Sequence, residues 1–312
     1  MKPHMPTDFH SHLERYGPEG DYATPSLAQA RSYCARLART HYENFSVASL
    51  LLPRKLLPHF HAVYAYCRWA DDLGDEVDGG PRALALLDWW RRELLHCYQR
   101  KARHPVLVAL EPTIRRFTIP SRTFLDLVKA FEQDQQVKRY ESFEQLVGYC
   151  RNSANPVGRL VLYLCEVHDE LRGALADSIC TGLQLANFWQ DVARDYAIGR
   201  VYLPAEDRQR FGYTDADLDA RRFTPAFSEL MRFEVARARG LFQRGRPLVE
   251  LMPVEFRGDI EIFIAGGLAI LRKIEHVGYN VWAQRPVLDR WEKAALLGGA
   301  LWRRAWRHVA GS

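Results

Sequence analysis

Hydrophobic positions recur with helical spacing along nearly the whole chain, and strand-like alternation is scarce. The pattern therefore predicts an all-α protein. Prolines and serines indicate where helices begin, and a glycine indicates where the longest one ends. Helices are predicted to begin at Pro25-Ser26, Pro58 and Pro81, to be capped by Ser121 or Ser142, and to run from Leu171 to about Ala197, before Gly199-Arg200.

The last third of the chain contains a change of pattern. Residues Val201 to Thr224 include Pro204, Gly212 and several aspartates, which predicts a loop with short helical pieces. Two long helices and a C-terminal helix at 289–309 should follow. No shift in composition marks a boundary, so we expect one domain over residues 1–312, with its core at about 25–290.

Two acidic segments far apart in the sequence share the spacing Asp-x-x-x-Asp. One contains Asp71 and Asp75, and the other contains Asp191 and Asp195. Carboxylates four residues apart lie on one face of a helix and repel each other unless a positive charge sits between them. Two such pairs facing each other would bind divalent cations. Mg²⁺ is typically held by one or two carboxylates and substrate phosphates, so the pattern indicates a phosphorylated ligand.

Each acidic pair continues as a polar line along its helix, and large apolar side chains surround the second line. This pattern predicts that the second pair points into an interior cavity. The alternative is ordinary exposed charge, above all for the first pair, whose acidic run leads into the turn Gly79-Gly80-Pro81. The polar lines consist of Tyr64, Arg68, Asp71 and Asp75 in the first segment, and of Gln184, Asn187, Asp191 and Asp195 in the second.

Three strings are more specific than a lone Asp-x-x-x-Asp: residues 41–47 (HYENFSV), 64–72 (YAYCRWADD) and 187–192 (NFWQDV). On these strings the chain resembles the squalene/phytoene synthase family, from about His41 to Arg285. Within the family it is most similar to the hydroxysqualene synthases of bacterial hopanoid pathways. Sister synthases usually have Ser-Phe and Asn-x-x-Arg-Asp where this chain has Asn44-Phe45 and Gln190.

The resemblance implies an isoprenoid synthase fold, a helical bundle around a central cavity. It also implies Mg²⁺-dependent ionisation of presqualene diphosphate, rearrangement of the cation and capture by water to give hydroxysqualene and diphosphate. Other enzymes of the squalene pathway would be partners. The implied metal ligands are Asp71, Asp75, Asn187, Asp191 and Asp195; the implied catalytic residues are the four aspartates and Tyr149; the implied substrate-binding residues are His41, Asn44, Tyr64, Arg68, Asn152, Gln184, Asn187, Gln190 and Tyr279.

Several of these assignments have structural alternatives. Arg68 could contact diphosphate or merely neutralise Asp71 and Asp72. A lone histidine such as His41 is commonly structural, and the tyrosines could be core residues whose hydroxyls need partners. Arg194 should lie on another face and make a surface ion pair.

The segment 149–158 (YCRNSANPVG) should break its helix, because Pro156 lacks a backbone donor and disfavours helix before it. Its polar residues Asn152, Ser153 and Asn155 could position a water molecule. They could equally cap the broken helix ends.

Composition excludes some classes of protein. A net charge of +5 from 43 basic and 38 acidic residues is too small to indicate nucleic-acid binding. Six cysteines without Cys-x-x-Cys, and no signal-like N-terminus, predict buried reduced thiols in a cytoplasmic protein. The longest apolar run, 262–271, is too short to cross a bilayer. Trp302 and Trp306 beside basic residues could lie on an anionic membrane surface or pack on the body.

Two other functions remain open. One is a sister synthase that condenses two prenyl diphosphates to presqualene diphosphate, dehydrosqualene or phytoene. The other is a catalytically silent helical scaffold, which intact acidic pairs disfavour because uncompensated like charges cost stability.

Overall fold

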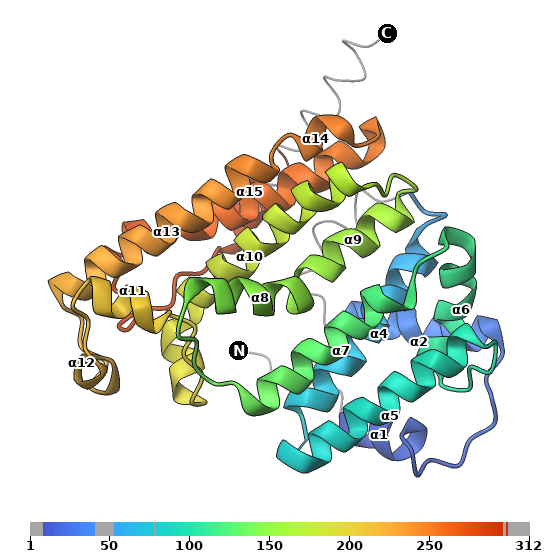
Figure 1. Cartoon of the computed structure of the whole chain (residues 1–312). Helices are drawn as coiled ribbons and strands as arrows, with labels where there is room; N and C mark the ends of the chain where they lie inside the picture. Colours follow the sequence, from blue (N-terminus) through green and yellow to red (C-terminus); the bar gives the residue numbers. More distant parts are fainter. Residues whose placement is uncertain (1–8, 41–52, 78, 296–297, 299–312) are drawn as a thin grey trace, which may run out of the picture. The chain divides into compact units, whose positions relative to one another are not determined.

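The computed structural model describes residues 9–40, 53–77, 79–295 and 298, and every regular element among them is a helix (Figure 1). The all-α prediction is thus confirmed. Internal contacts divide the described chain into two compact units, the first reaching to Gln136 with residues 163–166, the second comprising 137–162 and the residues from Val167 onward. A single domain over 1–312 stays a prediction.

The first unit is built around the helix that carries Asp71 and Asp75. This helix, α4 (Leu57–Asp75), packs against four others, and eleven of its residues are buried. Pro58 and Pro81 lie in the first turns of α4 and α5, as predicted. The other helices of this unit are α1 (Phe9–Tyr16), α2 (Leu27–Thr40), α5 (Gly80–Tyr98), α6 (Pro105–Phe117) and α7 (Ser121–Gln136).

The second unit is built around the helix that carries Asp191 and Asp195. This helix, α10 (Glu170–Ala197), packs against α8, α13, α14 and α15, and its bounds differ by one residue from the prediction. Gly199 takes a φ of 78° just beyond it, a conformation that favours glycine. The other helices are α8 (Phe143–Ser153), α9 (Asn155–Leu164), α11 (Ala205–Arg210), α12 (Asp215–Asp219), α13 (Pro225–Gly245), α14 (Leu248–Leu251) and α15 (Val254–His276).

The remaining helix predictions have mixed outcomes. Ser142 caps α8 by accepting a hydrogen bond from the Gln145 amide at 3.3 Å, and α11 and α12 are the expected short pieces. The short helix α14 was not predicted. Of the predicted C-terminal helix, residues 290–295 are helical and most of the rest lies outside the described residues.

All six cysteines are free, and four of them are buried, which confirms the prediction of unpaired thiols. None of the helices that the structure describes combines the length and the apolar character required to cross a bilayer.

Glycines allow the long helices of the second unit to approach closely, which gives a stability prediction with a matched control. A Cβ at Gly267 would lie 2.2 Å from Phe242 Cζ, whereas one at Gly266 would meet nothing within 4 Å. Because Phe242 is fully buried, we expect Gly267→Ala to lower the free energy of unfolding by about 1–3 kcal/mol. Gly266→Ala should raise it by up to about 1 kcal/mol through helix propensity. Urea denaturation measures both, and equal effects would contradict this packing.

Candidate active site

In the first unit, Arg68 links the acidic residues of α4. Its Nη1 donates to Asp71 Oδ2 at 3.2 Å, and its Nη2 forms an ion pair with Asp72. Asp72 is only 3% exposed, while Asp75 is exposed. Burial raises the pKa of Asp72 to about 7, and the guanidinium of Arg68 opposes this shift. Arg68 thus pairs with both carboxylates, as its neutralising role requires, and its contact with diphosphate stays a prediction.

From the sequence, Asp72 was expected only as a carboxylate that Arg68 could neutralise, and it was not among the candidate site residues. The spacing in the sequence already indicated the pairing with Arg68, because residues four apart lie on one face of a helix. Tyr64, one turn before Arg68, is partly buried. Burial raises the pKa of Tyr64 to about 12, with Arg68 acting in the opposite direction, so its hydroxyl is protonated at neutral pH.

In the second unit, Arg285 forms two hydrogen bonds with the carboxylate of Asp191. Its Nη2 donates to Asp191 Oδ2 at 2.9 Å, and its Nε donates to Oδ1. Gln190 fixes the same segment, because its side chain donates to the Pro286 carbonyl. Arg194 lies 3.9 Å from Asp191 and is exposed, which agrees with the expected surface ion pair.

The carboxylate of Asp195 is bonded less completely than that of Asp191. Its Oδ2 is buried and has no hydrogen-bond partner within the described part of the chain. Burial, and then the charge of Asp191, raise the pKa of Asp195 to about 7. The polar line of α10 is only partly buried, since Asn187 is exposed and Gln184 is partly exposed.

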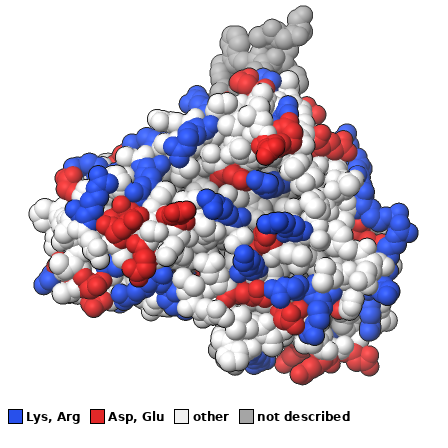
Figure 2. Space-filling model, viewed as in Figure 1, with Lys and Arg blue, Asp and Glu red and all other residues white. Residues whose placement is uncertain are grey.

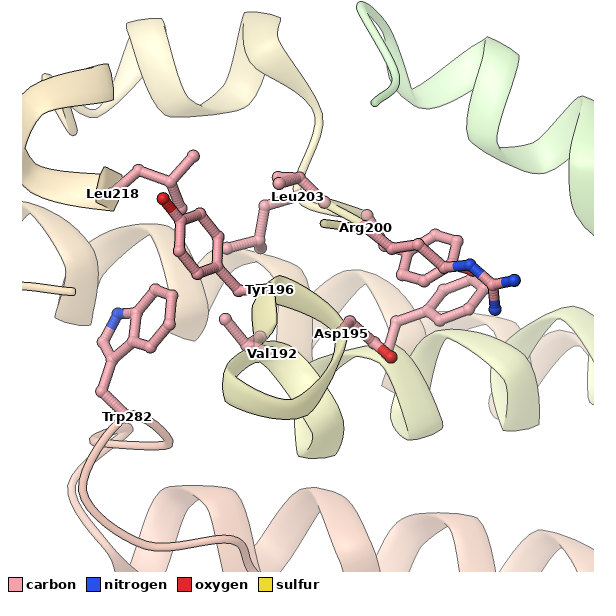
Figure 3. A pocket seen from close by; sticks show the side chains of 10 residues that line it. Val192, Asp195, Tyr196, Arg200, Leu203, Leu218 and Trp282 are labelled. Atoms are coloured by element: carbon pink, nitrogen blue, oxygen red, sulfur yellow. The ribbon is translucent and has the colours of Figure 1, made fainter. Parts of the chain in front are cut away.

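Asp195 faces a small pocket walled mainly by apolar and aromatic side chains (Figure 3). The apolar wall explains the desolvation of its carboxylate, and the nearby charge of Arg200 opposes the resulting pKa shift. The other lining residues are Phe188, Val192, Tyr196, Val201, Tyr202, Leu203, Leu218 and Trp282.

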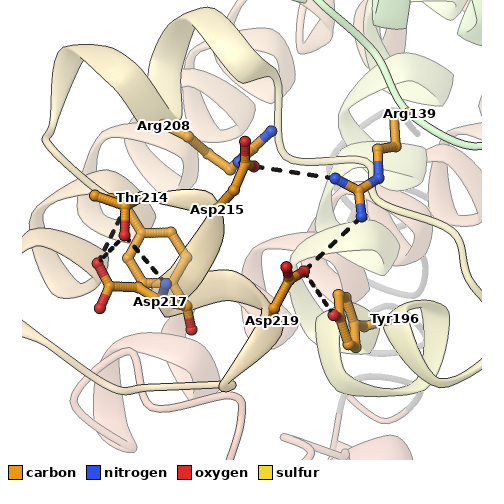
Figure 4. A network of polar contacts seen from close by, with 8 residues as sticks. Arg139, Tyr196, Arg208, Thr214, Asp215, Asp217 and Asp219 are labelled. Carbon is orange, nitrogen blue, oxygen red and sulfur yellow. Dashed lines mark hydrogen bonds and ion pairs between the residues drawn. The ribbon is translucent and has the colours of Figure 1, made fainter.

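A polar network holds the pocket's outer wall, and the sequence reasoning did not foresee it (Figure 4). Arg139 lies 4.0 Å from both Asp215 and Asp219 of α12. The hydroxyl of Tyr196, the neighbour of Asp195, donates to Asp219 at 2.9 Å. These contacts fix α12, and with it Leu218, against the end of α10.

Tyr149 belongs to a buried aromatic cluster with Tyr140, Phe188 and Tyr202. The rings of Phe188 and Tyr202 stack at 3.7 Å with an interplanar angle of 10°. The centroid of Tyr149 is 6.1 Å from Tyr202 and 6.2 Å from Phe188. The cluster connects Tyr149 to the pocket, because Phe188 and Tyr202 belong to the cluster and also line the pocket.

The predicted helix break lies at Ala154, between α8 and α9. Asn155 is buried, and its Oδ1 accepts a hydrogen bond from Thr181 Oγ1 at 2.9 Å, so its amide ties the break to α10. Ser153 Oγ is buried without a hydrogen-bond partner among the described residues. Asn152 is partly buried. Water placement by Asn152 or Ser153 stays a prediction.

The remaining predicted residues do not join these groups. Tyr279 has a φ of 66° and lies beside Arg232, whose guanidinium carbon is 5.4 Å from the ring centroid. His41, Asn44, Trp302 and Trp306 lie outside the described residues.

The donor chemistry of each acidic motif fits Mg²⁺ only in part. Carboxylate oxygens are the ligands that Mg²⁺ prefers, and the buried unpartnered Oδ2 of Asp195 is an oxygen that a cation would compensate. No cluster of three or more metal-binding side chains forms within the described ranges. One motif thus supplies too few ligands for an all-protein cage, as expected for a cation bound together with a phosphate.

Comparison with known proteins defines the class to which this fold and these acidic helices belong. Residues 38–292 match the squalene/phytoene synthase family, and the chain belongs to that family. The chain is 36% identical to the hydroxysqualene synthase of Rhodopseudomonas palustris, over 73% of this chain and 78% of the relative. It is 27% identical to the 15-cis-phytoene synthase of Synechococcus elongatus, over 90% and 95%. The crystal structure of squalene synthase HpnC from Alicyclobacillus acidocaldarius superposes with a TM-score of 0.79 at 44% identity, covering 81% of this chain and 96% of that one.

The Arg285–Asp191 contact predicts a stability difference between two arginines that face one carboxylate. Arg285→Gln should lower the free energy of unfolding by about 1–3 kcal/mol, because it leaves a buried carboxylate without its charged partner. Arg194→Gln, which changes an exposed arginine 3.9 Å from the same carboxylate, should change it by less than about 0.5 kcal/mol. Chemical denaturation without divalent cations compares them, and a larger loss for Arg194→Gln would refute the assignment.

Proposed function

We propose that this protein is a hydroxysqualene synthase that converts presqualene diphosphate and water to hydroxysqualene and diphosphate. One observation carries the choice within the family. Identity to the hydroxysqualene synthase of R. palustris is 36%, against 27% to the phytoene synthase of S. elongatus. The 44% sequence identity to squalene synthase HpnC supports the same branch of the family.

The acidic residues would bind the diphosphate through Mg²⁺, and the ligands proposed are Asp71, Asp75, Asn187, Asp191 and Asp195. The ion would neutralise the charge that grows on the leaving diphosphate. Arg68 is held by Asp71 and Asp72, so its guanidinium is already oriented when an anion arrives. Such preorganisation avoids reorganisation during the reaction.

The proposed reaction begins when the C–O bond to diphosphate breaks and the electron pair leaves with diphosphate. The remaining carbocation rearranges and then bonds to the oxygen of one water molecule, which loses a proton. Premature capture must be prevented, and the cluster around Tyr149 is buried and aromatic, as this requires. Aromatic faces would also attract the cation by about 0.5–2 kcal/mol.

A second candidate is condensation of two prenyl diphosphates, as in a phytoene synthase. The observation that favours it is the length of the match, because the similarity to the S. elongatus enzyme extends over 90% of this chain. The two functions differ in substrate. A condensing enzyme binds two diphosphates, whereas the proposed reaction consumes one diphosphate and one water.

We predict that the protein with Mg²⁺, and without NADPH, converts presqualene diphosphate to hydroxysqualene. Farnesyl diphosphate alone should give little product. Incubation with each substrate, followed by mass spectrometry of the extracted lipids, distinguishes the candidates. Efficient formation of presqualene diphosphate or phytoene from simple prenyl diphosphates would establish the second candidate instead.

Removal of one carboxylate from either motif should abolish most of the activity. Asp71→Ala or Asp191→Ala should lower kcat/KM by about two orders of magnitude or more, because each removes a proposed ligand of the cation that stabilises the leaving diphosphate. Asp88→Ala, on the exposed side of α5, is the control and should have near-normal activity. Circular dichroism checks folding, and near-normal turnover of either site variant would remove both enzymatic assignments.

A further inference from the structure

A buried cluster of charged groups in the second unit lies outside both acidic motifs. Glu234 of α13 is fully buried, Asp207 of α11 is 3% exposed, and the guanidinium of Arg237 contacts both carboxyl groups. On the face that Figure 2 draws, by contrast, basic and acidic side chains lie intermingled at the surface, where water screens them. The buried cluster lacks this screening, so its charges must balance among its own members.

Arg237 is bonded more completely to Asp207 than to Glu234. Its Nη1 donates to Asp207 Oδ2 at 2.7 Å and its Nη2 donates to Oδ1 at 3.2 Å, which is the two-bond geometry of a guanidinium on a carboxylate. Only the same Nη1 reaches Glu234, at 3.2 Å from Oε1 and 3.3 Å from Oε2. The rings of Phe143 and Phe233 lie against the guanidinium, with centroids 3.9 Å and 4.3 Å from its carbon. Asp207 is therefore the carboxylate partner of Arg237.

Two carboxylates beside one guanidinium would leave an excess negative charge in this buried site. A proton on Glu234 removes the excess, and it also gives Glu234 a hydrogen to donate to Asp207. Burial holds the pKa of Glu234 well above its ordinary value, Arg237 opposes this shift, and both the charge of Asp207 and a hydrogen bond to it add to the shift. The bonding of Arg237 and the balance of charge thus assign the proton to Glu234.

The charges that act on Glu234 come from two elements. They are Arg237 on its own helix and Asp207 on α11. The helices α10 and α15 also pack against α13, and within the described part of the chain neither supplies one of these charges. Glu275 of α15 pairs instead with Arg239, at 2.8 Å. The balance at Glu234 therefore depends on one guanidinium and one carboxylate.

We propose that Glu234 and Asp207 share one proton, which fastens α11 to α13, and that the segment 205–219 loosens when a rise in pH removes this proton to solvent. While the proton is present, the positive charge of Arg237 balances the single negative charge of the two carboxyl groups. Without it, two buried carboxylates face one guanidinium and repel each other. The shared proton is independent of the proposed function, so its test needs no substrate.

Loosening of α11 would reach the pocket beside Asp195 through α12. Arg208 of α11 is buried and pairs with Asp215, the first residue of α12 (Figure 4). Leu218 of α12 and Leu203, ahead of α11, line the pocket that Asp195 faces. The shared proton would therefore hold one wall of this pocket.

The test compares the full-length wild type with Glu234→Gln, whose side chain keeps the shape and a hydrogen-bond donor but has no acidic proton. A glutamate in an unfolded chain ionises near about pH 4.3, so above that pH a proton kept by the folded protein weakens folding as pH rises. In urea unfolding from about pH 6 to about pH 8, the unfolding equilibrium constant of the wild type should rise relative to that of Glu234→Gln by up to about tenfold per pH unit. A constant ratio over this range would overturn the proposal.

Glu229→Gln is the matched control, because Glu229 lies on the same helix but is exposed and pairs with the exposed Arg232. The ratio of its unfolding constant to that of the wild type should change by less than about twofold over the same pH range. A change as large as that for Glu234→Gln would contradict the proposal.

Asp207→Asn distinguishes a shared proton from burial alone. Once position 207 is neutral, Arg237 balances an ionised Glu234 and no proton is needed. In the Asp207→Asn background, adding Glu234→Gln should therefore leave the pH dependence of unfolding nearly unchanged, with circular dichroism as the check on folding. If the full pH dependence of the ratio persists there, burial alone holds the proton and the sharing is refuted.

Hydrogen exchange with mass spectrometry tests where the protein loosens, and it stays decisive if Asp207→Asn fails to fold. After correction for the intrinsic effect of pH on exchange, amides of 205–219 should lose protection at higher pH in the wild type and keep it in Glu234→Gln. Unchanged protection of this segment in the wild type, or an equal loss throughout α15, would contradict the proposal.

Discussion

The burial of carboxylates in the two central helices is the constraint on which the rest of this structure depends. Each compact unit packs around the helix that carries an acidic motif, so α4 and α10 are also the most surrounded helices. A buried charge is costly unless it is paired. In both helices an arginine pairs with the buried carboxylate and offsets this cost: Arg68 pairs with Asp72, and Arg285 pairs with Asp191.

These arginines also determine which carboxylate oxygens are available to a metal ion. Arg285 donates to both oxygens of Asp191, so a cation that binds Asp191 would share these oxygens with a guanidinium whose positive charge opposes its binding. Asp195, four residues on, has a buried Oδ2 that accepts no hydrogen bond from any residue the structure describes. One helix therefore carries a carboxylate that is bonded at both oxygens and another with an unbonded buried oxygen, and the second gives the stronger reason to expect a cation.

Much of the fold could be predicted from the sequence because its signals are local. Helix spacing, Ser142 as a cap and the break before Pro156 depend only on neighbouring residues. The Arg285–Asp191 pair joins residues 94 positions apart, so no local sequence pattern could predict it. The same holds for Arg139 with α12 and for Asn155 with Thr181. Asn155 was expected to cap a helix end or to place water, and its bond to the distant Thr181 could not be read from the sequence.

The proposed function requires that a carbocation made from presqualene diphosphate is captured by water in this protein. The most direct measurement is turnover of presqualene diphosphate in ¹⁸O-labelled water, with mass spectrometry of the product. The account predicts an alcohol that carries one ¹⁸O atom. A hydrocarbon product, or an alcohol without the label, would contradict it.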